Sequence, residues 1–388
     1  MAEKRQRDVP DDADEKWFLA EHSAAKHEIL RRYLGAWLTI LGRGQPSGFQ
    51  HKQLVLIDGF AGRGRYMTGE PGSPAIMFDR AVQVADADLV EQVVVSCFEP
   101  NRTNFGHLEE VCGQLRHPKV DLRPTPETFE QGARKFVEFA KKQAAPPPAF
   151  VMVDPYGVKG VRLATIRELL NFNRVEVFLT FMVRDPARFM EGYDDALTAL
   201  FGGTAWRRCI GVSDRPECLM RTFQEVVTAD AASYALPYKV HEDEKKTVLY
   251  YLVHLTNNDR GMRVMKEKMI RKSGEMTFFP ITLRPKDQLG LDVSETSPYP
   301  TLQAHLSRTY SGRTLNFVEL LNQDYPRGRS WIQGQYSKAL QSMERDEPPT
   351  ATVDRVNPLT KKTGQKTRAI GDRDKITVLA PAAQTSLL

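Results

Sequence analysis

The 388-residue sequence lacks any long hydrophobic run and contains only four cysteines. No segment reaches the roughly 18 consecutive apolar residues that a membrane-spanning helix needs. Residues 1–8 are rich in charge, where a secretory signal peptide would be apolar. The cysteines form no Cys-x-x-Cys pair, which argues against a zinc ribbon or an iron–sulfur cluster held by this chain. We therefore expect a cytoplasmic protein with no membrane segment and no metal site, in which the cysteines are reduced.

Charge of one sign is not in large excess either, because the formal net charge is only +5. Its distribution is uneven. Residues 262–388 contain 20 lysines and arginines against 13 acidic residues, whereas residues 1–261 contain 34 against 36. A basic C-terminal part favours an anionic partner, nucleic acid first, although a solvated basic surface has the same composition. The hydrophobic content of 41% is sufficient for a globular core, and the length predicts two or three domains.

A glycine-rich turn follows the short apolar run at 54–57 and begins with an acid. It has no Gly-Lys-Ser/Thr ending, so it is not a phosphate-binding P-loop. An acid in such a turn repels phosphate but suits a ligand that carries an ammonium or a sulfonium. The pattern therefore favours S-adenosylmethionine, with a tight strand-to-helix turn without ligand as the alternative. The candidate cofactor-binding residues here are Asp58, Gly59, Phe60, Gly62 and Gly64.

Two further apolar runs also end in acids. The run at 92–98 precedes Glu99, which could meet ribose hydroxyls or cap the following helix. The interval from the glycine turn is long, so we expect an insertion at 67–74. The run at 149–153 precedes Asp154. Continuous apolar runs are typical of parallel strands buried on both faces, whose ligands lie beyond their carboxyl ends. We therefore expect Asp58, Glu99 and Asp154 to share one site.

These motifs carry a resemblance. Residues 58–64 (DGFAGRG) and 154–157 (DPYG) resemble motifs I and IV of class I methyltransferases. With residues 25–30 (AKHEIL), 72–74 (GSP) and 250–257 (YYLVHLTN), the chain more closely resembles the bacterial three-Cys-motif partner family over most of its length. Residues 26–27 (KH) and 62–66 (GRGRY) are more distantly similar to the ribosomal-RNA adenine-N6 methyltransferases. Those enzymes carry Asp-Pro-Pro-Tyr where this chain has Asp-Pro-Tyr-Gly, a difference that bears on the adenine target more than on the cofactor.

The resemblance implies a Rossmann-like α/β fold and an S-adenosylmethionine-dependent methyl transfer. Asp154 and the Pro155 carbonyl would accept hydrogen bonds from an acceptor amine, and Tyr156 would stack on a base or act as a lid. Lys26 and His27 would contact the cofactor carboxylate or close the pocket, although each suits a structural role equally well. A further candidate, from the end of the third strand, is Glu127 for the cofactor adenine.

The remaining patterns outline the domains. We expect a tail at 1–16, a methyltransferase-like domain at 17–260 that is mostly helical from 187, a connecting region at 261–313, and a tail at 380–388. Residues 314–379 predict two helices followed by a basic hairpin, a combination typical of a winged helix. The candidate nucleic-acid-binding residues on this hairpin, expected at 359–368, are Lys361, Lys362, Lys366 and Arg368.

Three functions fit these features. The first is a methyltransferase acting on nucleic acid, with an amino group of a base as the acceptor. The second is a peptide or small-molecule methyltransferase that works beside a radical-SAM-like three-Cys-motif protein. The third is a non-catalytic subunit that keeps the fold and recruits such a partner to nucleic acid.

Overall fold

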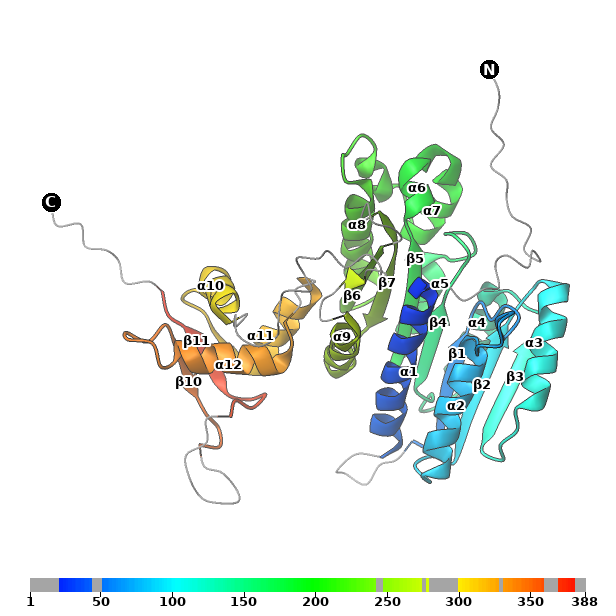
Figure 1. Cartoon of the computed structure of the whole chain (residues 1–388), viewed down its shortest axis with the longest axis horizontal. Helices are drawn as coiled ribbons and strands as arrows, with labels where there is room; N and C mark the ends of the chain where they lie inside the picture. The colour runs from blue at the N-terminus through cyan, green and yellow to red at the C-terminus, as the bar shows by residue number, and fades with distance from the viewer. Residues whose placement is uncertain are drawn as a thin grey trace. The chain divides into compact units, whose positions relative to one another are not determined.

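The computed structural model describes residues 21–43, 51–241, 247–273, 277–278, 299–327, 331–358 and 369–380. The chain forms two compact units, Met1–Ile281 and Thr282–Leu388 (Figure 1). The expected tail at 1–16, nearly all of the one at 380–388 and the candidate hairpin at 359–368 lie outside the described residues.

The first unit is built on a mixed sheet with the strand order β3-β2-β1-β4-β5-β7-β6-β8. Strand β7 runs antiparallel to both of its neighbours, and the other neighbouring strands pair in parallel. This is the Rossmann-like order of class I methyltransferase sheets, so the expected fold class is confirmed for this unit. The strands are β1 (Gln53–Asp58), β2 (Gln92–Phe98), β3 (Val120–Thr125), β4 (Ala149–Val153), β5 (Val175–Met182), β6 (Tyr234–His241), β7 (Val248–Thr256) and β8 (Thr277–Phe278).

Helices cover both faces of this sheet (Figure 1). On one face α1 packs against α2 and α9, and on the other α4 packs against α5, which contacts α7. Strands β1, β4 and β5 are almost entirely buried between these layers, as their continuous apolar sequences predict. The helices are α1 (Glu21–Gly42), α2 (Ser73–Asp86), α3 (Arg102–Gln114), α4 (Phe129–Lys141), α5 (Leu163–Leu170), α6 (Arg184–Arg188), α7 (Asp194–Phe201), α8 (Arg215–Asp230) and α9 (Asp259–Ser273), with 3-10 turns η2 (Met190–Tyr193) and η3 (Ala205–Cys209).

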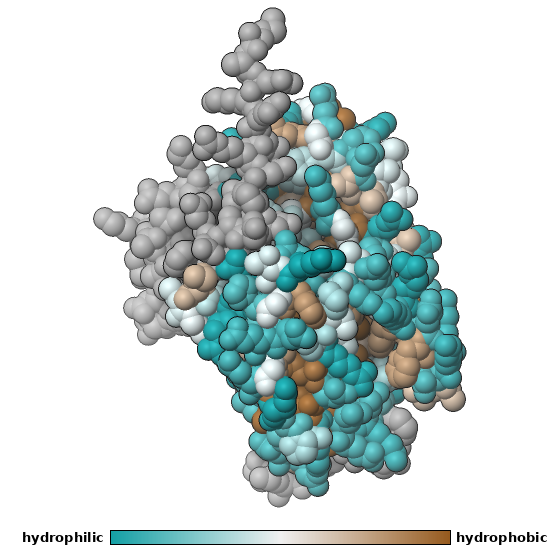
Figure 2. All heavy atoms as spheres, turned by 90° about the vertical axis from the view of Figure 1, so that its right-hand side faces the viewer, coloured by the Kyte–Doolittle hydropathy of each residue, from teal (hydrophilic) through white to brown (hydrophobic). Residues whose placement is uncertain are grey.

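The edge strand β3 carries polar and charged side chains. Asp121 and Arg123 form an ion pair on it, and Pro124 follows directly. Figure 2 looks onto this side of the molecule, where the visible surface is largely hydrophilic with small apolar patches. Charges and proline on an edge strand discourage pairing with another chain. None of the helices in the described ranges is both long and apolar enough to cross a membrane.

The expectation of a mostly helical segment at 187–260 is correct for α7 and α8 and wrong for 234–256. That stretch forms the two long paired strands β6 and β7, with Tyr250 and Tyr251 buried in β7. The largely apolar run of β7 has no period that distinguishes a buried strand from a buried helix, and in β6 Pro237 and Lys239 interrupt the apolar residues, so neither segment was recognised as a strand.

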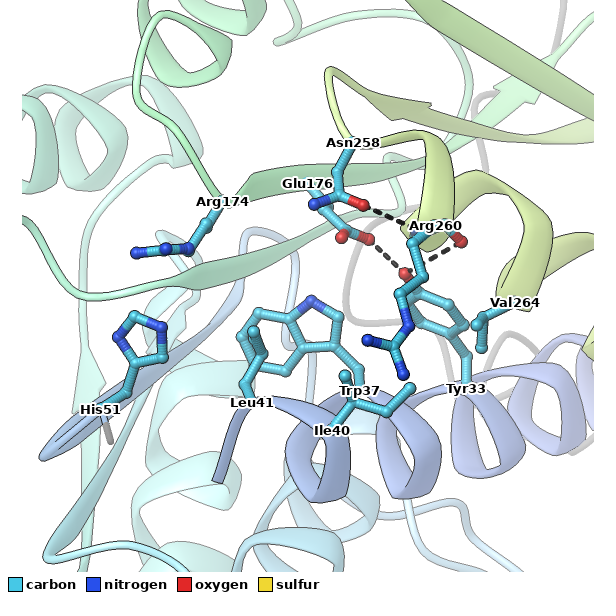
Figure 3. A pocket seen from close by; sticks show the side chains of 11 residues that line it. Tyr33, Trp37, Ile40, Leu41, His51, Arg174, Glu176, Asn258, Arg260 and Val264 are labelled. Carbon is cyan, nitrogen blue, oxygen red and sulfur yellow. Dashed lines mark hydrogen bonds between the residues drawn. The ribbon is translucent and has the colours of Figure 1, made fainter. Parts of the chain in front are cut away.

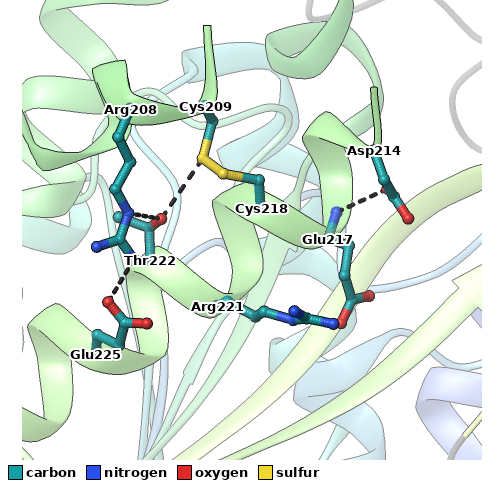
Figure 4. The surroundings of a disulfide bond; sticks show 8 residues. All are labelled: Arg208, Cys209, Asp214, Glu217, Cys218, Arg221, Thr222 and Glu225. Carbon is teal, nitrogen blue, oxygen red and sulfur yellow. Dashed lines mark hydrogen bonds and ion pairs between the residues drawn. A yellow bond between two sulfur atoms is a disulfide. The ribbon is translucent and has the colours of Figure 1, made fainter. Parts of the chain in front are cut away.

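The expectation that all cysteines are reduced is also wrong. Cys209 of η3 and Cys218 of α8 form a disulfide, with their Cα atoms 5.6 Å apart (Figure 4). The Thr222 hydroxyl lies 3.5 Å from Cys209 Sγ and accepts a hydrogen bond from Arg208. The two cysteines are nine residues apart, and only the fold of the segment after β5 brings them together. Cys97 and Cys112 are free and buried.

The second unit contains α10 (Tyr299–Tyr310), β9 (Thr314–Asn316), α11 (Phe317–Asp324), η6 (Tyr325–Arg327), α12 (Gln333–Met343), β10 (Ala351–Asp354) and β11 (Lys375–Val378). Its strands form an antiparallel sheet in the order β10-β11-β9. The buried Asp324 carboxylate is bonded by His305 Nε2 at 2.8 Å, by Tyr310 at 3.1 Å and by Tyr336. This one acid therefore ties α10, α11 and α12 together. Helix α9 belongs to the first unit and α10 to the second, and the boundaries expected between 261 and 313 stay a prediction.

Candidate active site

The candidate site lies at the carboxyl edge of the sheet, where the chain crosses from one side of β1 to the other. Strand β1 pairs with β2 on one side and with β4 on the other, and the strand order reverses between β1 and β4. Asp58 is in register with Cys97 and with Met152. Glu99 and Asp154 each follow those partners by two residues, so the three acids emerge at the same edge. Open α/β sheets bind ligands at this kind of switch point.

The glycine turn lets the backbone pass close to its neighbours. The Gly59 N–H donates to the Met152 carbonyl at 2.9 Å, and a Cβ on Gly59 would lie 2.6 Å from the Phe129 ring. Gly62 and Gly64 have φ angles of 58° and 75°, in the left-handed region that other residues adopt only with strain. The expected insertion forms a small turn between Arg65 and Pro71, and α2 begins at Ser73.

Asp58 is a fully buried carboxyl with an unused oxygen. Its Oδ1 accepts a hydrogen bond from the Phe60 N–H at 3.2 Å, whereas its Oδ2 has no hydrogen-bond partner among the described residues. Burial raises the pKa of Asp58 to about 6, although the nearby Ser73 hydroxyl and the Phe60 N–H act in the opposite direction. A carboxylate that is costly to ionise without a partner is suited to a cationic group of a ligand.

Asp154 has its partner within the protein. Helix α1 places Lys26 in an ion pair with Asp154 Oδ2, and the two side chains are 9% and 22% exposed. Burial opposes ionisation of Asp154, but the charge and hydrogen bond of Lys26, aided by the Thr180 hydroxyl, lower the pKa of Asp154 below its usual value. The same pairing overcomes burial and raises the pKa of Lys26. The site therefore holds an ionised Asp154.

His27 is a buried, neutral side chain next to Lys26. It is 3% exposed, and burial followed by the charge of Lys26 lowers its pKa to about 3. Its Nε2 lies 3.5 Å from the Tyr66 hydroxyl, and the two rings are 5.6 Å apart between centroids. His27 and Tyr66 thus pack together beside Lys26.

Glu99 and Glu127 occupy different surroundings. Glu99 is 8% exposed, and its Oε1 accepts the Asn101 N–H at 2.8 Å. The N-cap of α3 is Asn101 itself, so Glu99 is not the helix cap. Glu127 lies just before Thr128, the N-cap of α4, and forms an ion pair with Lys135 on that helix. Its place by a cofactor adenine stays a prediction.

Pro155 and Tyr156 directly follow Asp154. Pro155 is buried, whereas the Tyr156 side chain is 73% exposed. Gly157 follows with a φ of 95°, which turns the chain away from the edge. An aromatic ring is therefore presented to solvent next to the Asp154 carboxylate.

Sequence reasoning missed Tyr66, Ser73 and Thr180 as members of this site. Ser73 and Tyr66 lie on the segment between β1 and α2, and Thr180 lies in the middle of β5. None of these three residues belongs to a sequence pattern that would identify it as a site residue. Ser73 and Tyr66 lie within segments that carry the resemblance, 72–74 and 62–66, but the resemblance assigns them no role. The described residues contain no group of three or more His, Cys, Asp or Glu side chains placed to hold a metal ion.

Comparison with known proteins gives structural likenesses only. No protein-family model and no curated protein sequence matches the chain. Human methyltransferase-like protein 13 in complex with SAH is 9% identical, with 70% of this chain and 100% of that chain covered and a TM-score of 0.32. TYW2 from M. jannaschii in complex with AdoMet is 10% identical, with 62% and 78% covered and a TM-score of 0.30. An rRNA methylase from Streptococcus thermophilus is 10% identical, with 57% and 92% covered and a TM-score of 0.27.

Proposed function

We propose that this protein is an S-adenosylmethionine-dependent methyltransferase that acts on nucleic acid, with an amino group of a base as the acceptor. The observation that carries the proposal is the buried Asp58 carboxylate at the switch point of the sheet, whose Oδ2 has no hydrogen-bond partner within the part of the chain that the structure describes. The site thus combines a buried carboxylate oxygen suited to a cationic group with a glycine turn whose backbone a ligand can approach closely.

The residues at this edge fit the cofactor. Asp58 and the turn from Gly59 to Gly64 would hold its methionine part, with the ammonium at Asp58 Oδ2. Glu99 would accept hydrogen bonds from the ribose hydroxyls, and Glu127 would meet the adenine. Bound there, the cofactor supplies an electrophilic methyl group on a sulfonium.

Asp154 would orient the acceptor. Its Oδ2 is taken by Lys26, so its other oxygen would accept a hydrogen bond from an acceptor amine, and the Pro155 carbonyl would accept a second. Lys26 keeps Asp154 ionised, which makes the hydrogen bond to the amine charge-assisted. An amine needs no strong base here, because methylation acidifies the proton that it then loses. Tyr156 would stack on the base.

The loops around this edge support a nucleic-acid acceptor. Several of the most exposed large apolar side chains lie on segments that follow β1, β4 and β5, namely Met67, Tyr156, Phe189, Ile210 and Val212. The Arg188 guanidinium lies 5.7 Å from the centroid of the Phe189 ring. Exposed rings beside cationic side chains are the usual platform for unstacked bases and their phosphates.

The second unit supports the same partner. Its order of helix, strand, two helices and an antiparallel strand pair would fit the winged helix expected from the sequence, a common nucleic-acid-binding module. The segment between β10 and β11 would be the wing, and it contains Lys361, Lys362, Lys366 and Arg368. These four residues lie outside the described part of the chain, so their contact with phosphate is proposed from the sequence.

We further propose a role as a cytoplasmic three-Cys-motif partner that works with a radical-SAM-like protein. This rests on the segments at 25–30, 58–64 and 154–157. A non-catalytic recruiting subunit is the second candidate, and the ion pair that ties up Asp154 Oδ2 favours it.

The test is calorimetric titration with S-adenosylhomocysteine. We expect binding in the micromolar range, of order −8 kcal/mol, abolished in Asp58→Ala and in Gly62→Val. Glu138→Gln, which changes an exposed acid on α4, is the matched control and should bind normally. No heat of binding to the wild type at two temperatures would remove the methyltransferase and leave the recruiting subunit.

A further inference from the structure

The disulfide that joins η3 to α8 lies at the carboxyl edge of the first unit's sheet, the edge of the candidate site. Tyr251 of β7 pairs with Phe181, one residue before the carboxyl end of β5, and its hydroxyl donates to Glu217 Oε2 at 3.0 Å. Glu217 directly precedes Cys218 in the first turn of α8. Strand β5 neighbours β4, and Asp154 follows the end of β4. The disulfide is therefore on the side of the sheet where the acceptor would bind.

The disulfide closes an exposed segment, residues 210–213, that bonds mainly to itself. The Ile210 N–H donates to the Arg207 carbonyl at 3.0 Å, and the Val212 N–H donates to the Cys209 carbonyl at 3.3 Å. Both bonds lie within the same short stretch of chain. The Ile210 and Val212 side chains are 57% and 39% exposed. The disulfide is the covalent link from this stretch to α8, and an exposed segment with few buried contacts opens at low free-energy cost when such a link is lost.

The same segment leads into a contact with α6. Arg215, two residues after it, donates from Nη1 to the Ala187 carbonyl at 3.2 Å. Arg188 and Phe189 follow Ala187 directly and are both exposed, with the Arg188 guanidinium 5.7 Å from the centroid of the Phe189 ring. A ring beside a guanidinium suits an unstacked base and its phosphate. The chain after Cys209 thus supports a surface with the chemistry that a nucleic acid needs.

Thiols can reach the disulfide from one side, because Cys209 is buried whereas Cys218 is only partly buried. A thiolate of a dithiol reductant would attack Cys218 Sγ, forming a mixed disulfide and releasing Cys209 as a thiolate that then takes a proton. The second thiol of the reductant would complete the reductant's own disulfide and release Cys218 as a thiol. Two electrons then pass from the reductant to the protein, and glutathione disulfide would reverse the exchange.

We propose that residues 209–215, with Arg188 and Phe189, form part of the surface that binds the acceptor nucleic acid, and that the disulfide between Cys209 and Cys218 controls its affinity. In the oxidised protein the segment is held beside α6 and the surface is ordered. Reduction frees residues 210–213 and weakens acceptor binding, whereas the glycine turn after β1 is unaffected. The identity of the ligand rests on the proposed function, but the control of the segment by the disulfide does not.

The test measures binding of a fluorescently labelled single-stranded oligonucleotide to the full chain, either oxidised with glutathione disulfide or reduced with dithiothreitol. Alkylation of free thiols followed by mass spectrometry confirms each state. We expect reduction to weaken oligonucleotide binding about tenfold, which is within the range for one lost stacked base, and to leave affinity for S-adenosylhomocysteine unchanged. The variant Cys209→Ser/Cys218→Ser should bind like the reduced protein and should not respond to dithiothreitol.

A pair of arginine variants locates the surface. Arg188→Gln should weaken oligonucleotide binding by the oxidised protein. Arg260→Gln is the matched control and should bind as the wild type does. Arg260 is also exposed, but it lies by the amino end of β5, where it lines a separate cavity of about 350 Å³ (Figure 3). Equal losses in the two variants would overturn the placement of the surface at α6.

Hydrogen exchange gives a readout that does not depend on the ligand. The amides of residues 210–213 should exchange faster after reduction, and those of β1 and β4 should not. Unchanged exchange, or equal oligonucleotide affinity in the two redox states, would overturn the redox control and leave the proposed methyltransferase intact. Loss of S-adenosylhomocysteine binding on reduction would also overturn it, because the change would then not be local. If no form bound the oligonucleotide while all bound S-adenosylhomocysteine, the nucleic-acid acceptor and this surface would be rejected together.

Discussion

The ends of β1 and β4 lie side by side, and each carries a buried or largely buried acid, yet the two acids are in opposite states. Burial raises the pKa of Asp58 to about 6, and its Oδ2 has no hydrogen-bond partner among the described residues. At the end of β4, Lys26 outweighs burial and lowers the pKa of Asp154. Burial alone therefore does not decide the charge of an acid, because its partners do. The Asp154 carboxylate at the end of β4 is paired with a cation of this chain, whereas none of the described residues pairs with Asp58 Oδ2 at the end of β1.

The largest expected effect comes from removing the partner at the β4 end. Lys26→Met should lower the free energy of unfolding by about 3–5 kcal/mol at neutral pH, because it leaves a largely buried carboxylate unpaired. Urea unfolding measures the change. The double variant Lys26→Met/Asp154→Asn should recover most of the loss, since it leaves no unpaired charge. A single variant as stable as the wild type would show that the ion pair is not what settles Asp154.

Asp58→Asn should have the opposite effect on stability. The folded pKa of Asp58, about 6, is above its ordinary value of 3.8, so the folded state holds the proton more tightly than the unfolded state. Wild-type stability is therefore lost as pH rises from about 4 to 6, and the difference of about two pKa units corresponds to about 3 kcal/mol. Because asparagine does not ionise, the Asp58→Asn variant should not lose this stability as the pH rises.

Urea unfolding from pH 4 to 8 checks this prediction. The variant and the wild type should be similar near pH 4, and the variant should be more stable by up to about 3 kcal/mol above pH 6.5. It should also lose affinity for S-adenosylhomocysteine. A variant that is less stable than the wild type at pH 8 would mean that Asp58 already has an internal cation.

Asp154→Asn tests whether the β4 end works on the acceptor. It keeps the shape and one acceptor oxygen but loses the charge, so turnover should fall roughly 10²-fold or more, about 2.7 kcal/mol of transition-state stabilisation. Affinity for S-adenosylhomocysteine should stay within a few-fold. Transfer of a tritiated methyl group to RNA or DNA measures turnover, with Glu138→Gln as the control. Undiminished transfer would reduce Asp154 to a structural partner of Lys26.

The smallest expected effect belongs to Tyr156, beside Asp154. Tyr156→Ala should weaken acceptor binding by about 1–3 kcal/mol, the contribution of one stacked base, and leave cofactor affinity unchanged. Phe139→Ala is the matched control, because Phe139 is another exposed aromatic side chain, 43% exposed, on α4. Equal effects of the two variants on acceptor affinity would argue against a stacking role for Tyr156.

Much of the fold was predictable from local patterns. The apolar runs at 54–57, 92–98, 149–153 and 175–181 are strands of one sheet, because continuous apolar sequence between turns suits a strand buried on both faces. Reasoning from local patterns failed for β6, whose apolar residues are interrupted by Pro237 and Lys239, and for β7, whose largely apolar run has no period that separates strand from helix. It also failed for Cys209 and Cys218, whose spacing matches no familiar motif.

The residues that end the strands can be read from local sequence patterns: an acid and a glycine turn after β1, and acids after β2 and β4. The chemistry of these acids depends on the tertiary fold. Lys26 is 128 residues from Asp154 in the chain, and it reaches that acid because α1 packs across the sheet. No comparable partner reaches Asp58 Oδ2 among the described residues. Strand ends follow from short-range patterns of apolar and polar residues. The pKa of a buried group follows from the few atoms within several ångströms of it, and packing brings those atoms from distant parts of the chain.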